Sequence, residues 1–499
     1  MIETLLQSAG ILFDPLNLLV LIGAVVAGAI VGATPGLTST MAIGLLVPIT
    51  FTMPQTLAFM LLLGIYCGGI YGGSITAILL NLPGTPTSVI TAIDGYAMTR
   101  RGEAGRAIAI ATVSSTLGGI ISCIFLIALS TQLAQLVIYF GAPEYMALGI
   151  FASAVVFTLS GESMLKGFVS LCFGFLIASV GIDPTAMHPR FTLGITELLI
   201  GVPPVPAIIG LFCVSEVFRM AEDRGLRAPI QRSLSGLRTG LTEFPRLWRT
   251  IGKGSAIGCL IGSLPGIGAL AASSLSYAEA KRASRRPERF GQGAEEGVSA
   301  AESANNAVTG GALVPTLTFG IPGDTNTLLI LSALTVQGLV PGPMLFREQS
   351  EFIYVIFGAL VLANLFILPV GLALSRTIAQ AALVPTRFLL PVVAVLAITG
   401  ASIGYGHIYY FWISIGFGLL GWLMQRAGFP LLPLAMALIL GPIVERSLRS
   451  SLMLPGAGVW YFLERPLVAG FLVLSLAVFA GRLWAGRRRP ASASADKTG

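Results

Sequence analysis

Residues 74–98 read S-I-T-A-I-L-L-N-L-P-G-T-P-T-S-V-I-T-A-I-D-G-Y-A-M, and this stretch decides how the chain folds. Its apolar first part ends at Pro83-Gly84, hydroxyl and proline residues follow, and a second apolar turn then begins. Residues 311–338 have the same design around Pro322-Gly323. A polar interruption that occurs twice within hydrophobic sequence is typical of a binding site built from two broken membrane helices.

The composition around these breaks is that of a membrane protein. Of 499 residues, 55% are hydrophobic and 11% are charged, whereas a soluble domain carries about 25% charged residues. Residues 15–93 contain no Asp, Glu, Lys or Arg. We therefore predict an all-α polytopic membrane protein with about 10–14 membrane segments, since one pass takes roughly 20 apolar residues.

The net charge of +7 is concentrated in short polar stretches, at 99–106, 219–253, 281–290 and 482–489. Basic loops favour the cytoplasmic side of a membrane, so we expect the C-terminus there. A nucleic-acid-binding face would need a soluble domain to carry it. The expected surroundings are therefore membrane lipid, with no nucleic acid.

Several chemical functions are disfavoured by the residues present. The five Cys lie singly in apolar segments, no C-x-x-C occurs, and there are two His, so no metal or other cofactor is expected. Neither a nucleophile assembly nor a phosphate-binding loop is found, which argues against an enzyme and against direct use of ATP. An ion gradient, of Na⁺ or H⁺, remains as the driving force. Residues 1–14 have no basic start, so no cleavable signal peptide is expected.

The breaks belong to a longer duplication. Residues 28, 32, 35 and 36 (Gly, Gly, Pro, Gly) recur 230 positions later, the 83–84 break recurs after 239, and the Gly and two Pro at 201, 203 and 206 recur after 227. Anchors in the same order at similar offsets indicate two pseudo-symmetric repeats. By analogy with other broken-helix carriers, we expect these repeats to be inverted, with re-entrant hairpins.

The predicted organisation is an N-terminal segment 1–14, repeat 1 at 15–218, a polar connector 219–253, repeat 2 at 254–448, a terminal membrane helix 465–484 and a disordered tail 485–499. Residues 107–143 are uncharged and long enough for two passes. Residues 254–278 lie between two basic stretches and are therefore expected to enter and return as a hairpin with Pro265-Gly266 at its tip.

The breaks carry the predicted chemistry. A helix that begins after a break presents backbone N–H groups and partial positive charge to an anion, and nearby hydroxyls donate further hydrogen bonds. The candidate substrate-binding residues are Pro35, Gly36, Ser39, Thr40, Pro83, Gly84, Thr85, Thr87, Ser88, Pro265, Gly266, Pro322, Gly323, Thr325, Asn326 and Thr327.

Oxygen-bearing side chains near the breaks suit a hard cation. The candidate cation-coupling residues are Asn81, Asn305, Asn306, Asp324 and Glu302. An acid within apolar sequence is a functional candidate. Asp324 also suits a helix N-cap. Glu302 also suits a solvated loop position, and capping or a salt bridge is the favoured role for Asp94.

With those residues in view, residues 10–450 resemble the large membrane subunit of tripartite tricarboxylate transporters, the TctA family. The matching stretches are G-A-T-P-G-L at 32–37, Y-G-G-S-I-T-A-I-L-L-N-L-P-G-T-P at 71–86, A-A-E-S-A-N-N-A at 300–307 and P-T-L-T-F-G-I-P-G at 315–323.

The resemblance implies a multi-pass permease of the bacterial inner membrane that imports citrate-like carboxylates by secondary active transport. It also implies two partners, a periplasmic solute-binding protein and a small membrane subunit. The alternatives are a non-transporting membrane assembly or receptor protein and an anion channel. A homodimer is one arrangement that the sequence leaves open.

Overall fold

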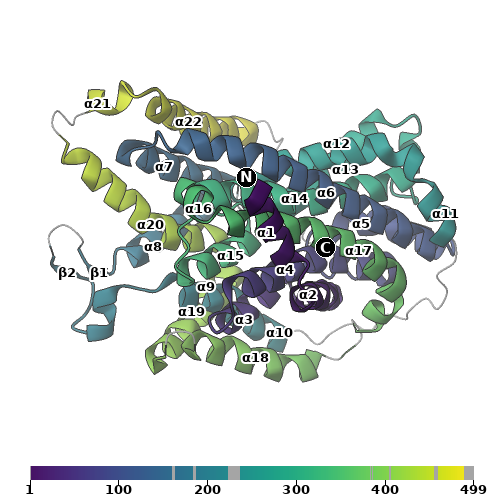
Figure 1. The fold of residues 1–499 in the computed structure, drawn as a ribbon, viewed down its shortest axis with the longest axis horizontal. Coiled ribbons are helices and arrows are strands. Elements are labelled where there is room, and N and C mark those ends of the chain that lie inside the picture. The colour runs from purple at the N-terminus through teal and green to yellow at the C-terminus, as the bar shows by residue number, and fades with distance from the viewer. Residues whose placement is uncertain are drawn as a thin grey trace. The chain divides into compact units, whose positions relative to one another are not determined.

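The computed structural model describes residues 2–159, 163–183, 187–222, 237–381, 384, 386–403, 406–454 and 459–487 (Figure 1). Part of the predicted connector and the predicted tail from residue 488 onward lie outside the described residues. The chain forms two compact units. Unit 1 comprises Met1–Ile138 and Pro203–Arg426, and unit 2 comprises Tyr139–Val202 and Ala427–Gly499, so each unit draws on both predicted repeats.

The helices of unit 1 are α1 (Ile2–Leu12), α2 (Pro15–Ala33), α3 (Ser39–Thr50), α4 (Gln55–Leu80), α5 (Ser88–Arg100), α6 (Ala104–Val137), α9 (Pro204–Ile209), η2 (Gly210–Val214), α10 (Ser215–Glu222), α11 (Leu237–Thr242), α12 (Phe244–Gly262), α13 (Gly268–Ala283), η3 (Pro287–Arg289), α14 (Glu295–Phe319), α15 (Thr325–Val336), α16 (Pro343–Glu348), α17 (Ser350–Ala381), α18 (Thr386–Ile403) and α19 (Ile408–Arg426). The elements of unit 2 are α7 (Ala142–Leu159), α8 (Met164–Ala178), β1 (Gly181–Ile182), β2 (Pro189–Arg190), η1 (Thr196–Ile200), α20 (Leu431–Leu452), α21 (Val459–Leu463) and α22 (Pro466–Arg487).

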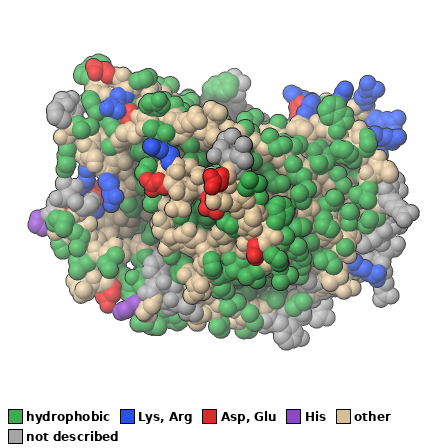
Figure 2. Space-filling model, in the orientation of Figure 1, with side chains coloured by type: hydrophobic (Ala, Val, Ile, Leu, Met, Phe, Trp, Pro, Cys, Tyr) green, Lys and Arg blue, Asp and Glu red, His purple; other side chains and the backbone are tan. Residues whose placement is uncertain are grey.

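The helices confirm an all-α polytopic membrane protein. Within the described residues, nine helices are long and apolar enough to cross a membrane, and four shorter apolar helices accompany them. Apolar side chains also cover much of the surface (Figure 2). A surface of that kind suits a chain whose solvent is lipid rather than water.

One predicted feature differs. The uncharged stretch 107–143, which is long enough for two passes, forms the single 34-residue helix α6 followed by the start of α7. The reason is that no proline interrupts the stretch before Pro143. At a rise of about 1.5 Å per residue, α6 is about 50 Å long and exceeds the hydrocarbon thickness of roughly 30 Å.

Small residues set the spacing of the helices in unit 1. A Cβ atom on Gly32 of α2 would overlap the backbone of Gly69 in α4, and one on Gly68 would overlap Val25. The second half repeats this pairing, because Gly258 of α12 lies against the backbone of Ala304 in α14. Without side chains between them, the backbones approach closely, as small residues allow in membrane helices.

The predicted hairpin forms around Pro265-Gly266. Helices α12 and α13 pack against each other and against α14, and residues 263–267 join them. Gly266 has a φ of +83°, a conformation that glycine adopts at low cost.

In unit 2, the helices α7, α8, α20 and α22 pack together, and β1 and β2 form a two-stranded hairpin between α8 and η1. Arg190 of this hairpin pairs with Glu445 at 2.6 Å, and Arg449 pairs with Asp183 at 2.9 Å. These ion pairs fix the loop to α20.

Candidate functional site

Helices α4 and α14 end with the same backbone geometry. Asn81 caps α4 with a φ of +55°, and Gly320 caps α14 with a φ of +69°. The cap N–H groups donate to Thr76 O and Pro315 O. All these positions differ by 239, the offset of the two breaks. Asn81, a candidate cation ligand, thus occupies the left-handed position that glycine occupies in the other half, and it is exposed.

The preceding breaks also match, at an offset of 230. Gly36 has a φ of +87° and Gly266 one of +83°. Thr34 N donates to Val31 O at 3.0 Å, and Leu264 N donates to Ile261 O at 3.1 Å. The backbone conformations at the two breaks are therefore similar. The duplication of the complete halves and its inversion remain predictions.

In each half, the glycine of the second break lies against a glycine at the end of the helix that precedes the first break. A Cβ atom on Gly84 would overlap Gly32 O, and one on Gly323 would lie 2.8 Å from Gly262 O. In the second half, Gly266 N also donates to Gly323 O at 2.9 Å. Pro265, Gly266, Pro322 and Gly323 are buried, so the predicted breaks of the second half form one packed junction.

Helix α3, which follows Pro35-Gly36, contacts helix α15, which follows Pro322-Gly323. Asn326 Oδ1, in the first turn of α15, accepts hydrogen bonds from Ser39 Oγ at 3.1 Å and Thr40 Oγ1 at 2.9 Å, in the first turn of α3. Thr40 Oγ1 also lies 3.0 Å from Thr325 Oγ1. Four candidate substrate ligands therefore lie together at two helix N-termini.

Asp324 caps α15. Its Oδ1 accepts from Thr327 N at 2.7 Å, and Thr327 Oγ1 donates to it at 2.8 Å. Its Oδ2 accepts from Tyr66 Oη of α4 at 2.8 Å. Asp324 is 8% exposed. The capping role expected for this acid is thus present, and Thr327 serves the cap.

The hydroxyls of the break at Pro83-Gly84 bond locally. Thr85 Oγ1 lies 3.0 Å from Thr87 Oγ1, and Ser88 Oγ donates to Thr85 O at 2.8 Å. Asn81 and Pro83 line a cavity of about 290 Å³ together with Tyr96 of α5. Thr85, Thr87 and Ser88 thus bond to one another, whereas Thr325 and Asn326 contact another helix. Pro35 and Gly36, at the other break of the first half, are half-buried.

Glu302 lies in the interior of α14 and is fully buried, so the solvated loop position considered for it is wrong. Its Oε1 accepts from Ser74 Oγ of α4 at 2.6 Å and from Thr91 Oγ1 of α5. Its Oε2 has no hydrogen-bond partner within the part of the chain that the structure describes.

Asn305 and Asn306 follow Glu302 by three and four positions, which places them on the same side of α14. Asn306 Nδ2 donates to Ser115 O at 2.7 Å and to Asn364 Oδ1 at 2.6 Å. Neither amide atom of Asn305 is hydrogen-bonded to any described residue, and Asn306 Oδ1 is likewise unpartnered. Both residues are completely buried. A buried polar atom without a hydrogen-bond partner is energetically costly. The unpartnered oxygen atoms of this cluster could instead coordinate a cation.

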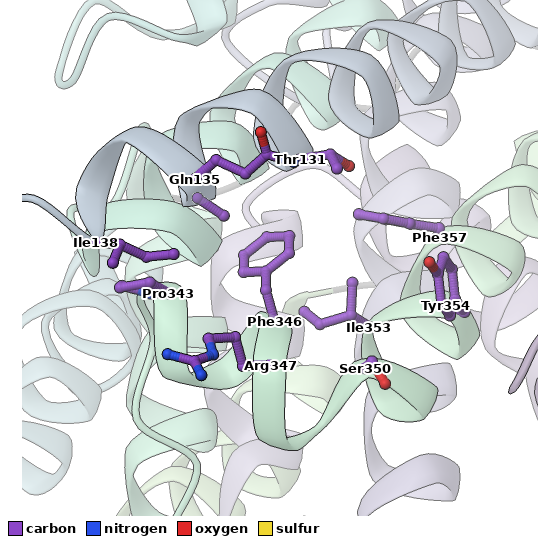
Figure 3. Close-up of a pocket in the computed structure, with 11 residues that line it drawn as sticks. Thr131, Gln135, Ile138, Pro343, Phe346, Arg347, Ser350, Ile353, Tyr354 and Phe357 are labelled. Atoms are coloured by element: carbon purple, nitrogen blue, oxygen red, sulfur yellow. The ribbon is translucent and has the colours of Figure 1, made fainter. Parts of the chain in front are cut away.

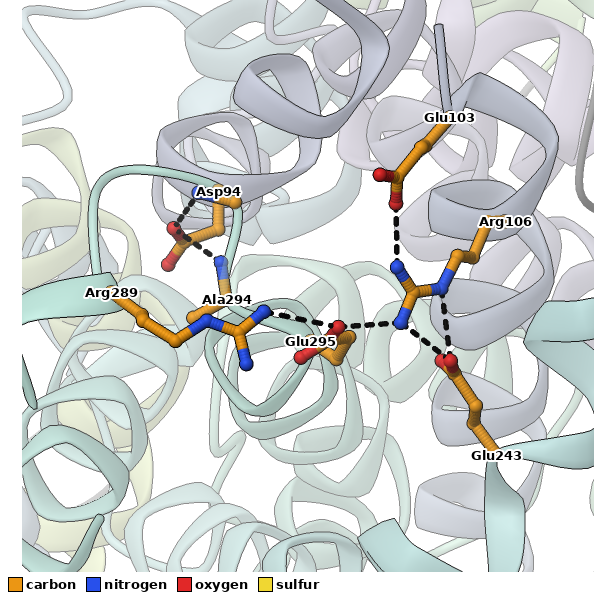
Figure 4. Close-up of polar contacts among 8 residues, drawn as sticks. Asp94, Glu103, Arg106, Glu243, Arg289, Ala294 and Glu295 are labelled. Carbon is orange, nitrogen blue, oxygen red and sulfur yellow. Dashed lines mark hydrogen bonds and ion pairs between the residues drawn. The ribbon is translucent and has the colours of Figure 1, made fainter. Parts of the chain in front are cut away.

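Asp94 and a neighbouring ion-pair network hold α5 and α6 to the start of α14 (Figure 4). Asp94 Oδ1 accepts from three backbone N–H groups, those of Gly291, Gly293 and Ala294, and Oδ2 accepts from Tyr277 Oη at 2.8 Å. The acid thus caps a loop, one of the two roles expected for it. Arg106 pairs in turn with Glu103, Glu243 and Glu295, and Arg289 pairs with Glu295 at 3.3 Å.

Several contacting residues escaped the sequence analysis. They are Tyr66, Ser74, Thr91 and Asn364. One signal was present for Tyr66, because it precedes Asn305 by 239 positions and so matches a candidate residue of the other half. The others are ordinary residues of apolar helices, and only their partners on other helices mark them.

An apolar cavity of about 200 Å³ lies at the other end of α6, between α6, α16 and α17 (Figure 3). Thr131 of α6, Ile138 directly after α6, Phe346 of α16 and Phe357 of α17 line it. Thr131 follows Arg106 by 25 residues, or about 37 Å of helix, which exceeds the hydrocarbon thickness. The cavity therefore lies more than one hydrocarbon thickness along α6 from the Arg106 network.

One family model and two proteins of known sequence match the chain. A family model described as tripartite tricarboxylate transporter TctA family matches residues 18–436. An uncharacterized 52.8 kDa protein in the TAR-I ttuC' 3'region of Agrobacterium vitis is 36% identical over 463 residues, 93% of this chain and 92% of the relative. An uncharacterized protein in the TAR-II ttuC' 3'region of the same organism is 33% identical over 219 residues, 44% of this chain and 90% of the relative. No solved structure matches the chain.

Proposed function

Because the chain belongs to the tripartite tricarboxylate transporter TctA family, we propose that it is the large permease subunit of a cation-coupled carboxylate uptake system. The substrate is a di- or tricarboxylate, which a periplasmic solute-binding protein delivers. A small membrane subunit completes the assembly in the bacterial inner membrane. The family membership disfavours the alternatives of a receptor and an anion channel.

The observation that carries this proposal is the meeting of α3 and α15 at their N-termini. Each helix N-terminus has roughly half a positive charge. Thr38 and Asp324 cap the third N–H group of α3 and α15, which leaves the first two N–H groups of each helix for a ligand. Ser39, Thr40 and Thr325 add hydroxyl donors at this point. Two helix ends and three hydroxyls can hold a carboxylate without an arginine.

Binding requires an exchange of hydrogen bonds. The hydroxyls of Ser39 and Thr40 now donate to Asn326 Oδ1. A substrate carboxylate replaces this oxygen as the acceptor, and the Asn326 amide then turns its Nδ2 donor toward the substrate. The exchange favours an anion because a charged acceptor makes hydrogen bonds roughly twice as strong as a neutral one.

The cation-coupling site lies on α14. Glu302 Oε2 and the amide oxygens of Asn305 and Asn306 are buried without partners among the described residues, and oxygen ligands of this kind suit Na⁺. Glu302 can instead carry a proton, since it is the one acid of this cluster. Ser74 and Thr91 hold the carboxylate from α4 and α5, next to the break at Pro83-Gly84. Asp324 contributes to coupling indirectly, because it caps α15 and orients the start of that helix.

The proposal is tested by uptake of a radiolabelled carboxylate panel into proteoliposomes that contain this chain, the small membrane subunit and the binding protein. We expect uptake that follows an imposed Na⁺ or proton gradient and ceases without the binding protein. Substrate flux that runs only down its own gradient would identify a channel, and binding without flux would identify a receptor.

Matched threonines of α15 test the anion site. Thr325 lies beside Thr40, whereas Thr335 donates to Leu331 O of its own helix. We expect Thr325→Val to raise the KM for the carboxylate about tenfold, since a hydrogen bond to a charged group contributes about 1.5 kcal/mol or more. Thr335→Val should leave KM unchanged, and an equal effect of both changes would contradict the assignment.

A further inference from the structure

A basic pocket lies between α12, α13 and η3, and neither Ser74 nor Thr91, which hold Glu302, lines it. Its volume is about 600 Å³, within the range of small-molecule sites. The basic side chains that line it are Arg246, Arg249, Lys253, Arg285, Arg286 and Arg289. Two acids, Glu279 and Glu296, also line it.

Most of this positive charge is not neutralised by the protein. Lys253 lies 3.7 Å from Glu279, and Arg289 pairs with Glu295. The remaining four arginines make no ion pair with any residue that the structure describes. The side chains form a patch of Lys and Arg over α12 and α13 (Figure 2, upper right). Four guanidinium groups without an ion-pair partner among the described residues, around one hollow, suit an anion with several oxygens.

Helix α12 carries the marks of a membrane interface beside this pocket. Trp248 is 58% exposed, and the guanidinium of Arg249 lies 5.4 Å from the centre of its ring. Exposed aromatic residues next to basic ones are typical of the headgroup level of a bilayer. The pocket is therefore placed where lipid headgroups lie.

Apolar surface continues from the pocket toward the hairpin turn. Leu260 of α12, Leu264 of the turn after it and Leu275 of α13 are exposed by 60%, 39% and 50%. Leu260 follows Trp248 by 12 residues, about 18 Å along the helix, which is more than half the hydrocarbon thickness. A molecule with a phosphate in the pocket and a long apolar tail along this surface matches both regions.

We propose that this pocket binds the phosphate-bearing headgroup of an anionic phospholipid from the surrounding leaflet. The arginines hold the phosphate oxygens, and the acyl chains lie along the exposed leucines of the α12–α13 hairpin. Basic pockets between membrane helices recognise such headgroups in general. The pocket shares no residue with the proposed carboxylate and cation sites, so a test of lipid binding is independent of the proposed transport function.

The lipid would also act on the ion-pair network at the start of α14. Arg289 lines the pocket and pairs with Glu295, which in turn pairs with Arg106 of α6 (Figure 4). A bound headgroup therefore joins α12 and α13 to the same cluster. We expect an anionic lipid to raise the thermal stability of the protein in detergent.

The experiment is native mass spectrometry of the purified full-length chain titrated with phosphatidylglycerol, phosphatidylcholine or inorganic phosphate. We expect phosphatidylglycerol to bind at least tenfold more tightly than the other two. Equal binding of phosphatidylcholine would overturn the role of the headgroup charge. Equal binding of inorganic phosphate would overturn the lipid as its source.

Three pairs of variants test where the lipid binds. Arg285→Gln with Arg286→Gln should weaken phosphatidylglycerol binding about 30-fold, since each basic residue near an anionic surface contributes about 1 kcal/mol. Lys281→Gln with Arg101→Gln removes the same charge from exposed positions outside the pocket and should change binding less than threefold. An equal loss in both pairs would show that net charge alone attracts the lipid and would overturn the site. Arg246→Gln with Arg249→Gln repeats the test from the α12 wall.

Discussion

Replacement of Asn326 by Asp places one negative charge at the centre of the proposed carboxylate site and changes the side chain by a single atom. The fold should tolerate the change. Ser39 and Thr40 can donate to a carboxylate oxygen as they donate to the amide oxygen, and an acid in the first turn of a helix is favourable. Asn326→Asp thus separates substrate repulsion from misfolding.

The size of the effect follows from the geometry. A substrate carboxylate in contact with Thr40 Oγ1 would lie about 5 Å from the new carboxylate, since Thr40 Oγ1 is 2.9 Å from Asn326 Oδ1. At an effective dielectric constant of about 20, two unit charges at that separation repel by about 3 kcal/mol. We therefore expect the KM for the carboxylate to rise about 100-fold.

The assay is initial-rate uptake in proteoliposomes over a range of carboxylate concentrations, at a saturating concentration of the coupling ion. Asn17→Asp makes the same exchange in the first turn of α2, where the side chain donates to Ile11 O, and should leave KM unchanged. A KM for Asn326→Asp within threefold of the wild-type value would refute a carboxylate site at these helix ends.

Three further predictions concern the cation cluster, the loop clamp and the glycine junction. Glu302→Gln, which mimics a permanently protonated acid, should remove most of the dependence of uptake on the ion gradient; a dependence like that of wild type would exclude Glu302 from coupling. Asp94→Ala leaves three loop N–H groups and the Tyr277 hydroxyl without their acceptor and should lower stability by about 3 kcal/mol or more, against about 1 kcal/mol for Tyr277→Phe, as compared by thermal unfolding in detergent. Gly323→Ala places a Cβ 2.6 Å from the Cα of Ala312 and should cost about 1–3 kcal/mol in the same measurement, whereas Gly416→Ala, with no atom within 4 Å, should be neutral or stabilising.

The helices and their breaks could be predicted from the sequence because each depends on residues that are close together in the chain. The ends of α2 and α4 lie where the apolar runs meet Thr34-Pro35 and Asn81, and Pro54 directly precedes α4. These boundaries depend on residues within one or two turns of each other. The hydrophobic composition fixed the protein class for the same reason, since each apolar run must be buried in lipid or protein wherever it folds.

The sequence by itself determined which segments break and which residues surround each break. Only the tertiary structure decided that Asn326 meets Ser39 and Thr40, that Ser74 and Thr91 hold Glu302, and that Asn305 is buried without a partner among the described residues. Asn326 and Thr40 are 286 positions apart, and no local propensity relates them. Helix packing brings such residues together, because close contact between glycine faces on several helices fixes where each helix end lies.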